Sequence, residues 1–305
     1  MKLIGHNKQI EHLNRVLARD VVASSYIFSG PADIGKRTLA EYFARAIIDG
    51  RKKIDFAEGS ERDYYGDLLT CAPLVEIKKV AKKSQKKKSK GLSREKKITH
   101  DITVEQMRDV VRELSLSSLH GHARVLIIDD ADRMGRGAQN AFLKTVEEPP
   151  HNAYIIFITS DASRLLSTMR SRCQMMSFGL LNEEDLREMC ADEQLRAFAM
   201  GRPGLLAQLQ KDDVLKEHYS AERENSALLQ TGTVAQRLHY AEELAQDKEY
   251  ARDILAQMQW HLRRRILQEE SYAEYAKIMR IEKMRQLLRT NVNTRMALEE
   301  LFLHL

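Results

Sequence analysis

The 305-residue sequence has little cysteine, proline or glycine and no long apolar run. Its three cysteines, Cys71, Cys173 and Cys190, lie far apart without a Cys-x-x-Cys pair, which excludes a disulfide framework and a zinc ribbon. No apolar stretch approaches the length of a membrane span, and the first residues turn polar too soon for a signal peptide. We therefore expect a cytoplasmic protein that uses no zinc and binds no membrane.

The net charge of +5 comes from a single segment. Residues 78–97 contain ten lysines and one arginine against one glutamate, so this segment carries +10 and the rest of the chain carries −5. The segment has no apolar period and repels itself, which predicts a flexible loop over 78–98. Two interpretations are open, a contact with nucleic-acid phosphates and a merely solvated loop. The lack of interleaved aromatic residues for base stacking favours the second.

Short apolar runs alternate with helical patterns over the first 180 residues. The runs that predict strands lie at residues 26–28, 74–77, 125–128, 154–158 and 174–178. The alternation, with a helix expected at 104–114 among others, predicts an α/β domain with a parallel sheet over 1–180. Only helical periodicity follows, which predicts a small helical domain over 181–210 and an all-α domain over 211–305.

The segment Gly-Pro-Ala-Asp-Ile-Gly-Lys-Arg-Thr, from Gly30 to Thr38, matches a phosphate-binding loop between a strand and a helix. In such a loop, backbone N–H groups surround phosphate oxygens, Gly30 and Gly35 let the main chain approach, and Lys36 reaches the β- and γ-phosphates. The next position normally carries a Ser or Thr hydroxyl for Mg²⁺, but here it is Arg37. Thr38 is a poor substitute, because one further residue along a helix turns the side chain by about 100°.

Acidic residues follow the apolar run at 125–128 and form a second candidate nucleotide motif. Asp129, at the carboxyl end of a strand, is placed to hold Mg²⁺ through water. Working ATPases usually have a Glu next, to orient the attacking water. Asp130 is one methylene shorter, and a displacement of about 1 Å can cost on the order of 100-fold in rate. Thr159, at the end of the next strand, is a candidate polar contact between the two motifs, although a plain strand end is its favoured interpretation.

An arginine stands just before the last predicted strand, in Ser171-Arg172-Cys173. Arg172 has no acidic partner nearby in sequence, which leaves two interpretations, a surface ion pair or a contact with phosphate on a neighbouring subunit. Arginine suits phosphate because its charge is permanent and its fork of donors is planar.

Together these motifs resemble the AAA+ subunits of clamp loaders. The likeness covers about two thirds of the chain and rests on Ile4-Gly5-His6, the phosphate-binding loop, Ala72-Pro73-Leu74-Val75-Glu76-Ile77, Asp129-Asp130-Ala131-Asp132, Val146-Glu147-Glu148-Pro149-Pro150, Thr159-Ser160, Ser171-Arg172-Cys173 and Gly201-Arg202-Pro203-Gly204. The resemblance implies an AAA+ P-loop domain over 1–180, a helical lid over 181–210 and a collar or oligomerisation domain over 211–305. Many relatives carry a four-cysteine zinc module after the P-loop helix, but this chain has only Cys71 there.

The resemblance also implies a function, that of a non-motor subunit in a DNA polymerase III clamp loader. In that family the arginine matching Arg172 acts in trans, as a finger on ATP bound by the adjacent motor subunit. Arg37, Asp130 and Gly204, which stands where active relatives keep a sensing arginine, are three departures from an active ATPase. We therefore expect no required cofactor, with ATP, ADP or phosphate as the only candidate residual ligands of the loop. The implied partners are gamma/tau-like motor subunits and a delta-like subunit and, through the complex, the sliding clamp and primed DNA.

Two rival functions are open at this point. The chain is alternatively an active motor ATPase of the same machine, or a nucleic-acid-binding accessory factor that works through the lysine-rich segment. In the C-terminal helices, Trp260 is interpreted as a half-buried core residue and Arg263-Arg264-Arg265 as a solvated basic turn.

Overall fold

The chain forms two compact units, one of Met1–Leu186 with Arg202–Gly204 and one of Arg187–Gly201 with Leu205–Leu305. Each unit is described here by itself. The further division at 210 into a lid and a collar stays a prediction. The computed structural model describes residues 3–56, 67–73, 75–79, 95–99, 101–116, 123–213, 216, 219–220, 232–269, 272–288, 290 and 292–305.

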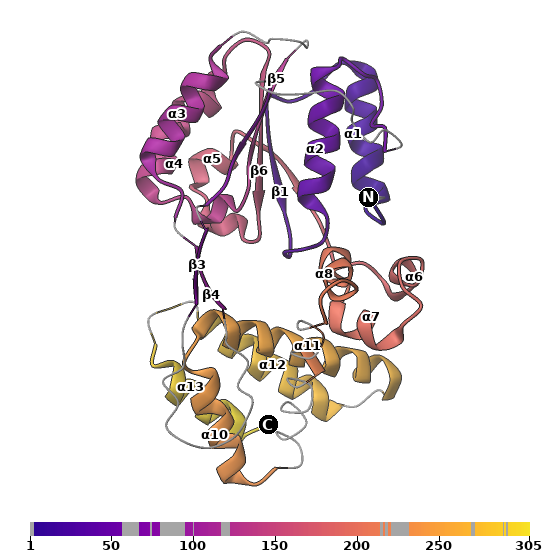
Figure 1. Ribbon diagram of the computed structural model, residues 1–305, viewed down its shortest axis with the longest axis vertical. Helices are drawn as coiled ribbons and strands as arrows, with labels where there is room; N and C mark the ends of the chain where they lie inside the picture. The colour runs from indigo at the N-terminus through magenta and orange to yellow at the C-terminus, as the bar shows by residue number, and fades with distance from the viewer. Residues whose placement is uncertain are drawn as a thin grey trace. The chain divides into compact units, whose positions relative to one another are not determined.

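A five-stranded parallel sheet forms the centre of the first unit (Figure 1). In pairing order its strands are β2 (Leu68–Cys71), β5 (Arg124–Ile128), β6 (Ala153–Thr159), β1 (Ser25–Ser29) and β7 (Gln174–Ser177). The central strands are nearly continuous apolar runs because both faces of a parallel sheet are covered. The strands predicted at 26–28, 125–128, 154–158 and 174–178 are confirmed, and so is the α/β class.

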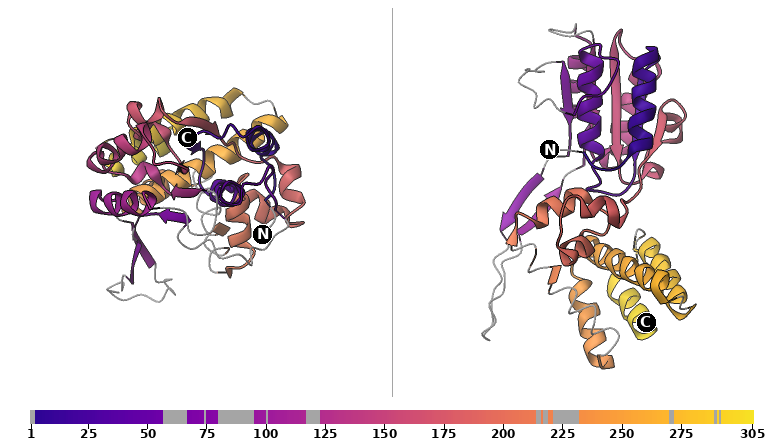
Figure 2. Two further views of the ribbon diagram at one scale, coloured as in Figure 1. Left: turned by 90° about the horizontal axis from the view of Figure 1, so that it is seen from above. Right: turned by 90° about the vertical axis from the view of Figure 1, so that its right-hand side faces the viewer.

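Helices cover both faces of this sheet (Figures 1 and 2). They are α1 (Asn7–Arg19) and α2 (Lys36–Ile48) on one face, and α3 (Val104–Leu114) and α4 (Arg136–Glu147) on the other. The helix predicted at 104–114 begins at a capping box, in which the Thr103 hydroxyl accepts from the Gln106 amide and the Gln106 side chain accepts from the Thr103 amide. α4 ends at Glu147, just before Pro149 and Pro150, because proline cannot continue a helix.

The alternation of side chains along β1 divides the core of this unit into two layers. Tyr26 and Phe28 are fully buried in the layer under α1 and α2, and Ile27 is fully buried in the layer under α3 and α4. The rings of Phe142 in α4 and Phe157 in β6 pack edge to face at 5.9 Å in the second layer. The strands are therefore held from both sides, and their ends form a stable platform.

One strand predicted for the parallel sheet belongs elsewhere. Residues 75–77 of the run at 74–77 lie in β3 (Val75–Lys79), which pairs antiparallel with β4 (Glu95–Thr99) in a separate two-stranded sheet. The edge strand of the parallel sheet is β2, which the sequence did not predict. Only Cys71 of its four residues is buried, because an edge strand has one neighbour, so its apolar signal is short.

Strands include both ends of the lysine-rich segment. Lys78 and Lys79 lie in β3, and residues 95–98 lie in β4. The flexibility predicted over 78–98 stays a prediction. Residues 80–94 lie outside the described residues.

The rest of the chain is helical where it is described. Its helices are α5 (Ser167–Arg170), α6 (Glu183–Arg187), α7 (Glu193–Ala199), α8 (Pro203–Leu209), α10 (Val234–Leu244), α11 (Lys248–Glu269), α12 (Tyr272–Leu287) and α13 (Thr294–Leu303), with short 3₁₀ turns at Ala131–Arg133 and Ala162–Arg164.

In the second unit α11 and α12 lie side by side (Figures 1 and 2). The Tyr240 and Phe302 rings stack at 5.7 Å in the apolar core of this unit. Trp260 is half-buried, as predicted, and Arg263 is exposed. The side chains of Arg264 and Arg265 lie outside the described residues. Among the described helices, none combines the length and apolarity that crossing a bilayer requires.

A buried ion pair fastens the start of β5 to the residue before β2. The Nε of Arg124 lies 3.8 Å from Oδ1 of Asp67, the two side chains are 5% and 1% exposed, and Arg124 also donates to the Glu113 carbonyl oxygen. Breaking a buried pair leaves a desolvated charge, which costs about 3–5 kcal/mol. We therefore expect Arg124→Met to lower the free energy of unfolding of this unit by about 3 kcal/mol, measured as a shift of the urea midpoint.

The matched control for this variant is Arg112→Met. Arg112 pairs with Asp109 at 3.1 Å, but both side chains are mostly exposed. Such pairs contribute about 0–1 kcal/mol, so this variant should unfold close to the native midpoint. Equal shifts for the two variants would contradict the stabilising role of the buried pair.

Candidate functional site

Strand order brings three candidate residues to one edge of the sheet. β6 lies between β1 and β5, and all three strands run parallel, so their carboxyl ends meet. Gly30 follows β1, Asp129 follows β5, and Thr159 ends β6. Open α/β sheets bind ligands at this edge. The phosphate-binding loop and the acidic motif, which are far apart in the sequence, therefore meet in the fold.

The loop between β1 and α2 needs its two glycines. Gly35 caps α2 with φ 94°, a left-handed conformation that glycine adopts without strain. At Gly30, an added Cβ would lie 2.3 Å from the carbonyl oxygen of Phe178. The strand, loop and helix expected here are confirmed, and α2 begins at Lys36.

Two contacts from distant segments brace this loop. The His6 ring Nε2 lies 2.7 Å from the carbonyl oxygen of Ile34, and burial lowers the pKa of His6. A neutral ring with its proton on Nε2 donates to this carbonyl. In α8, the Gly204 amide donates to the carbonyl oxygen of Asp33 at 2.7 Å, and a Cβ on Gly204 would lie 2.7 Å from that same oxygen. Position 204 therefore accepts no larger residue without movement of the loop.

Lys36 is bound by the loop that it was expected to serve. Its Nζ donates to the carbonyl oxygens of Gly30 at 2.7 Å and Pro31 at 2.5 Å, and the residue is only 6% exposed. Burial lowers the pKa of Lys36, while the charges of Asp129 and Asp130 raise it in part. The ammonium group thus donates to two main-chain acceptors of its own loop.

Arg37 extends from the first turn of α2 to the acidic motif. Its Nη1 lies 3.2 Å from Oδ2 of Asp129, and its Nε donates to Oε1 of Glu41 at 3.0 Å. The hydrogen bond to Glu41 is the largest of the effects that raise the pKa of Arg37 further, and Asp129 adds to it. A permanent cation therefore sits beside the carboxylate that the sequence assigned to Mg²⁺.

The two remaining candidates at this edge differ in their surroundings. Thr38 is half-buried in the first turn of α2, and its hydroxyl has no hydrogen-bond partner among the described residues. Asp130 has a left-handed backbone with φ 47°. Loss of hydration raises the pKa of Asp130, and the charges of Asp129 and Asp132 raise it further.

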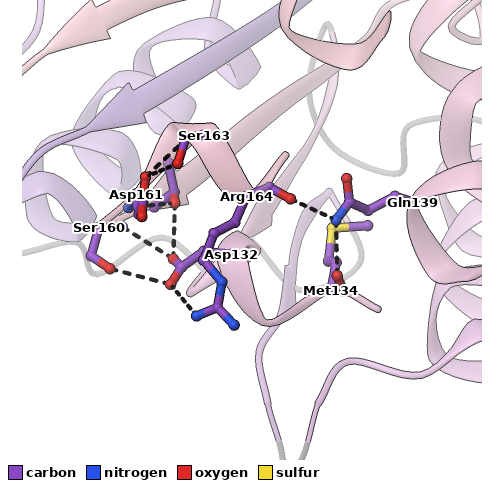
Figure 3. A network of polar contacts seen from close by, with 8 residues as sticks. Asp132, Met134, Gln139, Ser160, Asp161, Ser163 and Arg164 are labelled. Carbon is purple, nitrogen blue, oxygen red and sulfur yellow. Dashed lines mark hydrogen bonds and ion pairs between the residues drawn. The ribbon is translucent and has the colours of Figure 1, made fainter. Parts of the chain in front are cut away.

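Asp132 organises the end of β6, a role that the sequence did not predict (Figure 3). It accepts from the Thr159 hydroxyl at 2.8 Å and from the Ser160 amide and hydroxyl at 3.1 and 3.2 Å, and Arg164 lies 3.8 Å away. The Thr159 hydroxyl also accepts from the Asp161 amide at 3.0 Å. The Thr159 hydroxyl thus donates one hydrogen bond and accepts one, both at the carboxyl end of β6. These are the contacts of a plain strand end.

Gln139 is a second residue that sequence reasoning missed. It is 2% exposed in α4, where its amide donates to the carbonyl oxygens of Met134 and Arg164 (Figure 3). Its Oε1 accepts from the Leu166 amide. These bonds tie the turn after β5 to the segment that leads into α5. A polar residue at a buried helical position was the available signal.

Arg172 lies at the other edge of the sheet. It precedes β7. At the carboxyl end of β7, Ser177 pairs with Ser29, which lies next to the loop after β1. Gln174, at the amino end of β7, is about 10 Å from Ser177 along the strand, at ~3.3 Å per residue. Its Nη2 lies 3.0 Å from Oε1 of Glu147, with both side chains about two-fifths exposed. The structure thus contains the surface ion pair that was one of the two interpretations. It does not bring Arg172 to the residues of its own loop.

The cysteines are free thiols in separate places. Burial raises the pKa of the Cys173 thiol to about 12, and that of Cys71 is also raised by burial. Cys173 packs against the apolar layer under α3 and α4, so it anchors the segment that carries Arg172. The expectation that the chain uses no zinc stays a prediction.

Comparison with known proteins places this chain among DNA polymerase III subunits. The family model described as "DNA polymerase III, delta subunit" matches residues 5–182. The subunit delta' of Pseudomonas aeruginosa is 31% identical over 151 residues, which cover 50% of this chain and 42% of that protein. The subunit gamma of Buchnera aphidicola is 26% identical over 192 residues, which cover 60% of this chain and 46% of that protein. The matched part is therefore less than half the length of these curated relatives.

A solved structure shares the fold over nearly the whole chain. It is a DNA polymerase III gamma subunit-related protein from Thermotoga maritima, with a TM-score of 0.50 and 17% identity over 97% of this chain and 98% of that one. This likeness shows the fold alone.

The family match covers more than half of the 305 residues and includes both nucleotide motifs and Arg172. This chain belongs to the DNA polymerase III delta-subunit family of clamp-loader proteins.

Proposed function

We propose that this chain is a non-motor, delta-prime-like subunit of a DNA polymerase III clamp loader. In this role it does not turn over ATP itself. It holds gamma/tau-like motor subunits and a delta-like subunit in one complex and thereby supports ATP-dependent loading of the sliding clamp on primed DNA. The family supports the clamp-loader part of the proposal. The observation that carries the non-motor part is the ion pair between Arg37 and Asp129.

That ion pair opposes catalysis in two ways. Arg37 replaces the hydroxyl that would contribute a ligand to Mg²⁺, and its guanidinium neutralises the carboxylate that would hold the hydrated ion. The guanidinium does not lose its proton at any physiological pH, so Arg37 competes with Mg²⁺ for the Asp129 carboxylate throughout this range. Lys36, bound to the Gly30 and Pro31 carbonyls, further favours a loop that is satisfied without phosphate.

Two other positions support the same proposal. Asp130 is shorter than the Glu of working ATPases, and Gly204 leaves no room for the sensing arginine of active relatives, because its Cα faces the Asp33 carbonyl oxygen. Three departures in one site are more consistent with a non-motor subunit than with a motor.

Nucleotide binding by the purified chain tests this proposal. We expect no Mg²⁺-dependent micromolar affinity for ATP and no sustained hydrolysis, measured by calorimetry and phosphate release. Arg37→Ser restores a hydroxyl and frees Asp129. We therefore expect it to raise the affinity for ATP with Mg²⁺ by about tenfold or more, since a hydrogen bond or ligand to a charged group contributes about 1.5–3 kcal/mol.

Lys36→Ala is the control for these measurements. It should abolish whatever binding Arg37→Ser gains. Steady ATP turnover by the native chain that disappears in Lys36→Ala would identify a motor subunit and refute the non-motor proposal.

The trans role of Arg172 is the second part of the proposal. Arg172 lies at the sheet edge opposite to the phosphate-binding loop of its own chain, and its guanidinium is at the surface. Arg172 is therefore better placed for a phosphate on a neighbouring subunit than for one in its own loop. We propose that Arg172 contacts ATP held by an adjacent motor subunit. Arginine fingers in other phosphoryl-transfer systems contribute about 10³ to 10⁵ in rate.

Arg172→Ala in the reconstituted complex tests this role. We expect hydrolysis at the ATP site next to this chain to slow by about 10³-fold, while assembly measured by size-exclusion chromatography is unchanged. Arg108→Ala, which removes an exposed arginine from α3, is the control and should hydrolyse ATP at the native rate. Native hydrolysis with Arg172→Ala would remove the finger role.

A second candidate role, contact with DNA, is favoured by one feature of the β3–β4 pair. Its register sets Lys78 directly opposite Lys96. The two strands together contain four lysines and two glutamates in their sequence, and this excess of positive charge suits an anionic ligand. The major groove of duplex DNA admits a two-stranded ribbon of this kind. We therefore propose that these strands contact DNA phosphates during loading.

Salt dependence of DNA binding tests this second role. The variant replaces Lys78, Lys79, Lys96 and Lys97 by Gln in the full chain. For duplex DNA, each phosphate contact that is lost should reduce the slope of log K against log salt concentration by about 0.9. The slope is measured by fluorescence anisotropy. The control variant replaces the exposed Lys8, Lys53, Lys144 and Lys211 by Gln. Equal slopes for the two variants would rule out the strands as the contact.

A further inference from the structure

Arg172 is held from two helices of its own chain. Glu147 is the last residue of α4, and its Oε1 lies 3.0 Å from Nη2 of Arg172. The other terminal nitrogen, Nη1, donates to the Thr168 carbonyl oxygen at 2.9 Å and to the Ser171 hydroxyl at 3.4 Å, in α5 and at its C-cap. One end of the guanidinium is thus fixed by α5 and the other by α4.

This arrangement leaves part of the guanidinium available to a ligand. Arginine has five N–H donors, and the contacts above involve only its two terminal nitrogens. Within the described part of the chain, the Nε–H of Arg172 makes no hydrogen bond. The side chains of Arg172 and Glu147 are 41% and 43% exposed, so an incoming phosphate meets a guanidinium that is oriented but accessible.

The neighbouring residue shows that the contact is specific to one carboxylate. Glu148 follows Glu147 directly, has the same charge and is also exposed. Its backbone has left the helical conformation, with φ −129° and ψ 73° at the C-cap of α4. Among the described residues, Glu148 forms no ion pair. The end of α4 therefore directs one of two adjacent glutamates to Arg172.

We propose that Glu147 is a positioning residue, which orients the guanidinium of Arg172 for phosphate on a neighbouring subunit. This inference rests on the trans role proposed above for Arg172. A long arginine side chain loses rotamer freedom when it meets its ligand, and fixing it beforehand removes that cost from the later step. The pair does not need to break for this purpose, because among the described residues the Nε–H has no hydrogen-bond partner and the Arg172 side chain is partly exposed.

The ion pair also links the finger to the core of its own unit. α4 packs through Phe142 and Val146 into the apolar layer, and Gln139 of the same helix ties α4 to the segment before α5. Glu147 extends this connection by one more contact, from the end of α4 to the guanidinium itself.

The test uses the reconstituted complex with its motor subunits and measures kcat and KM for ATP. We expect Glu147→Ala to lower kcat by about fivefold to tenfold, because the remaining Thr168 and Ser171 contacts hold only one end of the guanidinium. KM for ATP should stay unchanged, since the nucleotide is bound by the neighbour. Glu147→Gln keeps an oxygen acceptor and should retain most of the native rate. Glu148→Ala removes the same charge one residue away and should match the native complex.

A double-variant cycle separates the two proposals. In the Arg172→Ala background, Glu147→Ala should have no further effect on kcat. If Arg172→Ala slows hydrolysis but Glu147→Ala behaves like Glu148→Ala, the finger role stands and the positioning role is wrong. If Glu147→Ala raises kcat, the carboxylate masks the finger, which also overturns positioning. If Arg172→Ala itself has no effect, the proposed function fails and this inference fails with it.

Discussion

The proposed loss of ATP hydrolysis depends on one contact, the guanidinium of Arg37 beside the carboxylate of Asp129. Arg37 starts in the first turn of α2 and ends 3.2 Å from the carboxylate that follows β5. Because Mg²⁺ takes oxygen ligands in a tight octahedral shell, a carboxylate already paired with arginine is a poor ligand for it. Lys36 likewise has partners within the site. Its buried ammonium group donates to two carbonyl oxygens of its own loop, so it needs no phosphate to complete its hydrogen bonds.

The parallel sheet separates this edge from the arginine proposed to act on a neighbour. The loop and Asp129 lie at the carboxyl ends of the strands, and Arg172 lies before the amino end of β7. A chain with this topology can lose the chemistry at one edge and keep the surface at the other, because the two are joined only through the rigid sheet and helix layers. That separation makes the two proposed properties, no ATP hydrolysis by this chain and a finger that acts on a neighbour, compatible in one fold.

Sequence patterns best predicted the strands whose residues are buried on both faces of the sheet. β5 and β6 are buried on both faces, and their apolar runs marked them clearly. β2 was missed because an edge strand of four residues, of which only Cys71 is buried, leaves little signal. The run at 74–77 was assigned to the wrong sheet, since apolar residues followed by lysines do not specify which partner strand they meet.

By itself, the sequence determined the family motifs, the helix and strand periodicities and the presence of Arg37 and Arg172 at informative positions. These depend on residue type and local spacing, which a sequence states directly. Only the tertiary structure decided that Arg37 pairs with Asp129, that Thr159 is held by Asp132, and that Glu147 holds Arg172. Each of these contacts joins residues from different elements, and strand order together with helix packing, rather than local sequence, sets the distances between them.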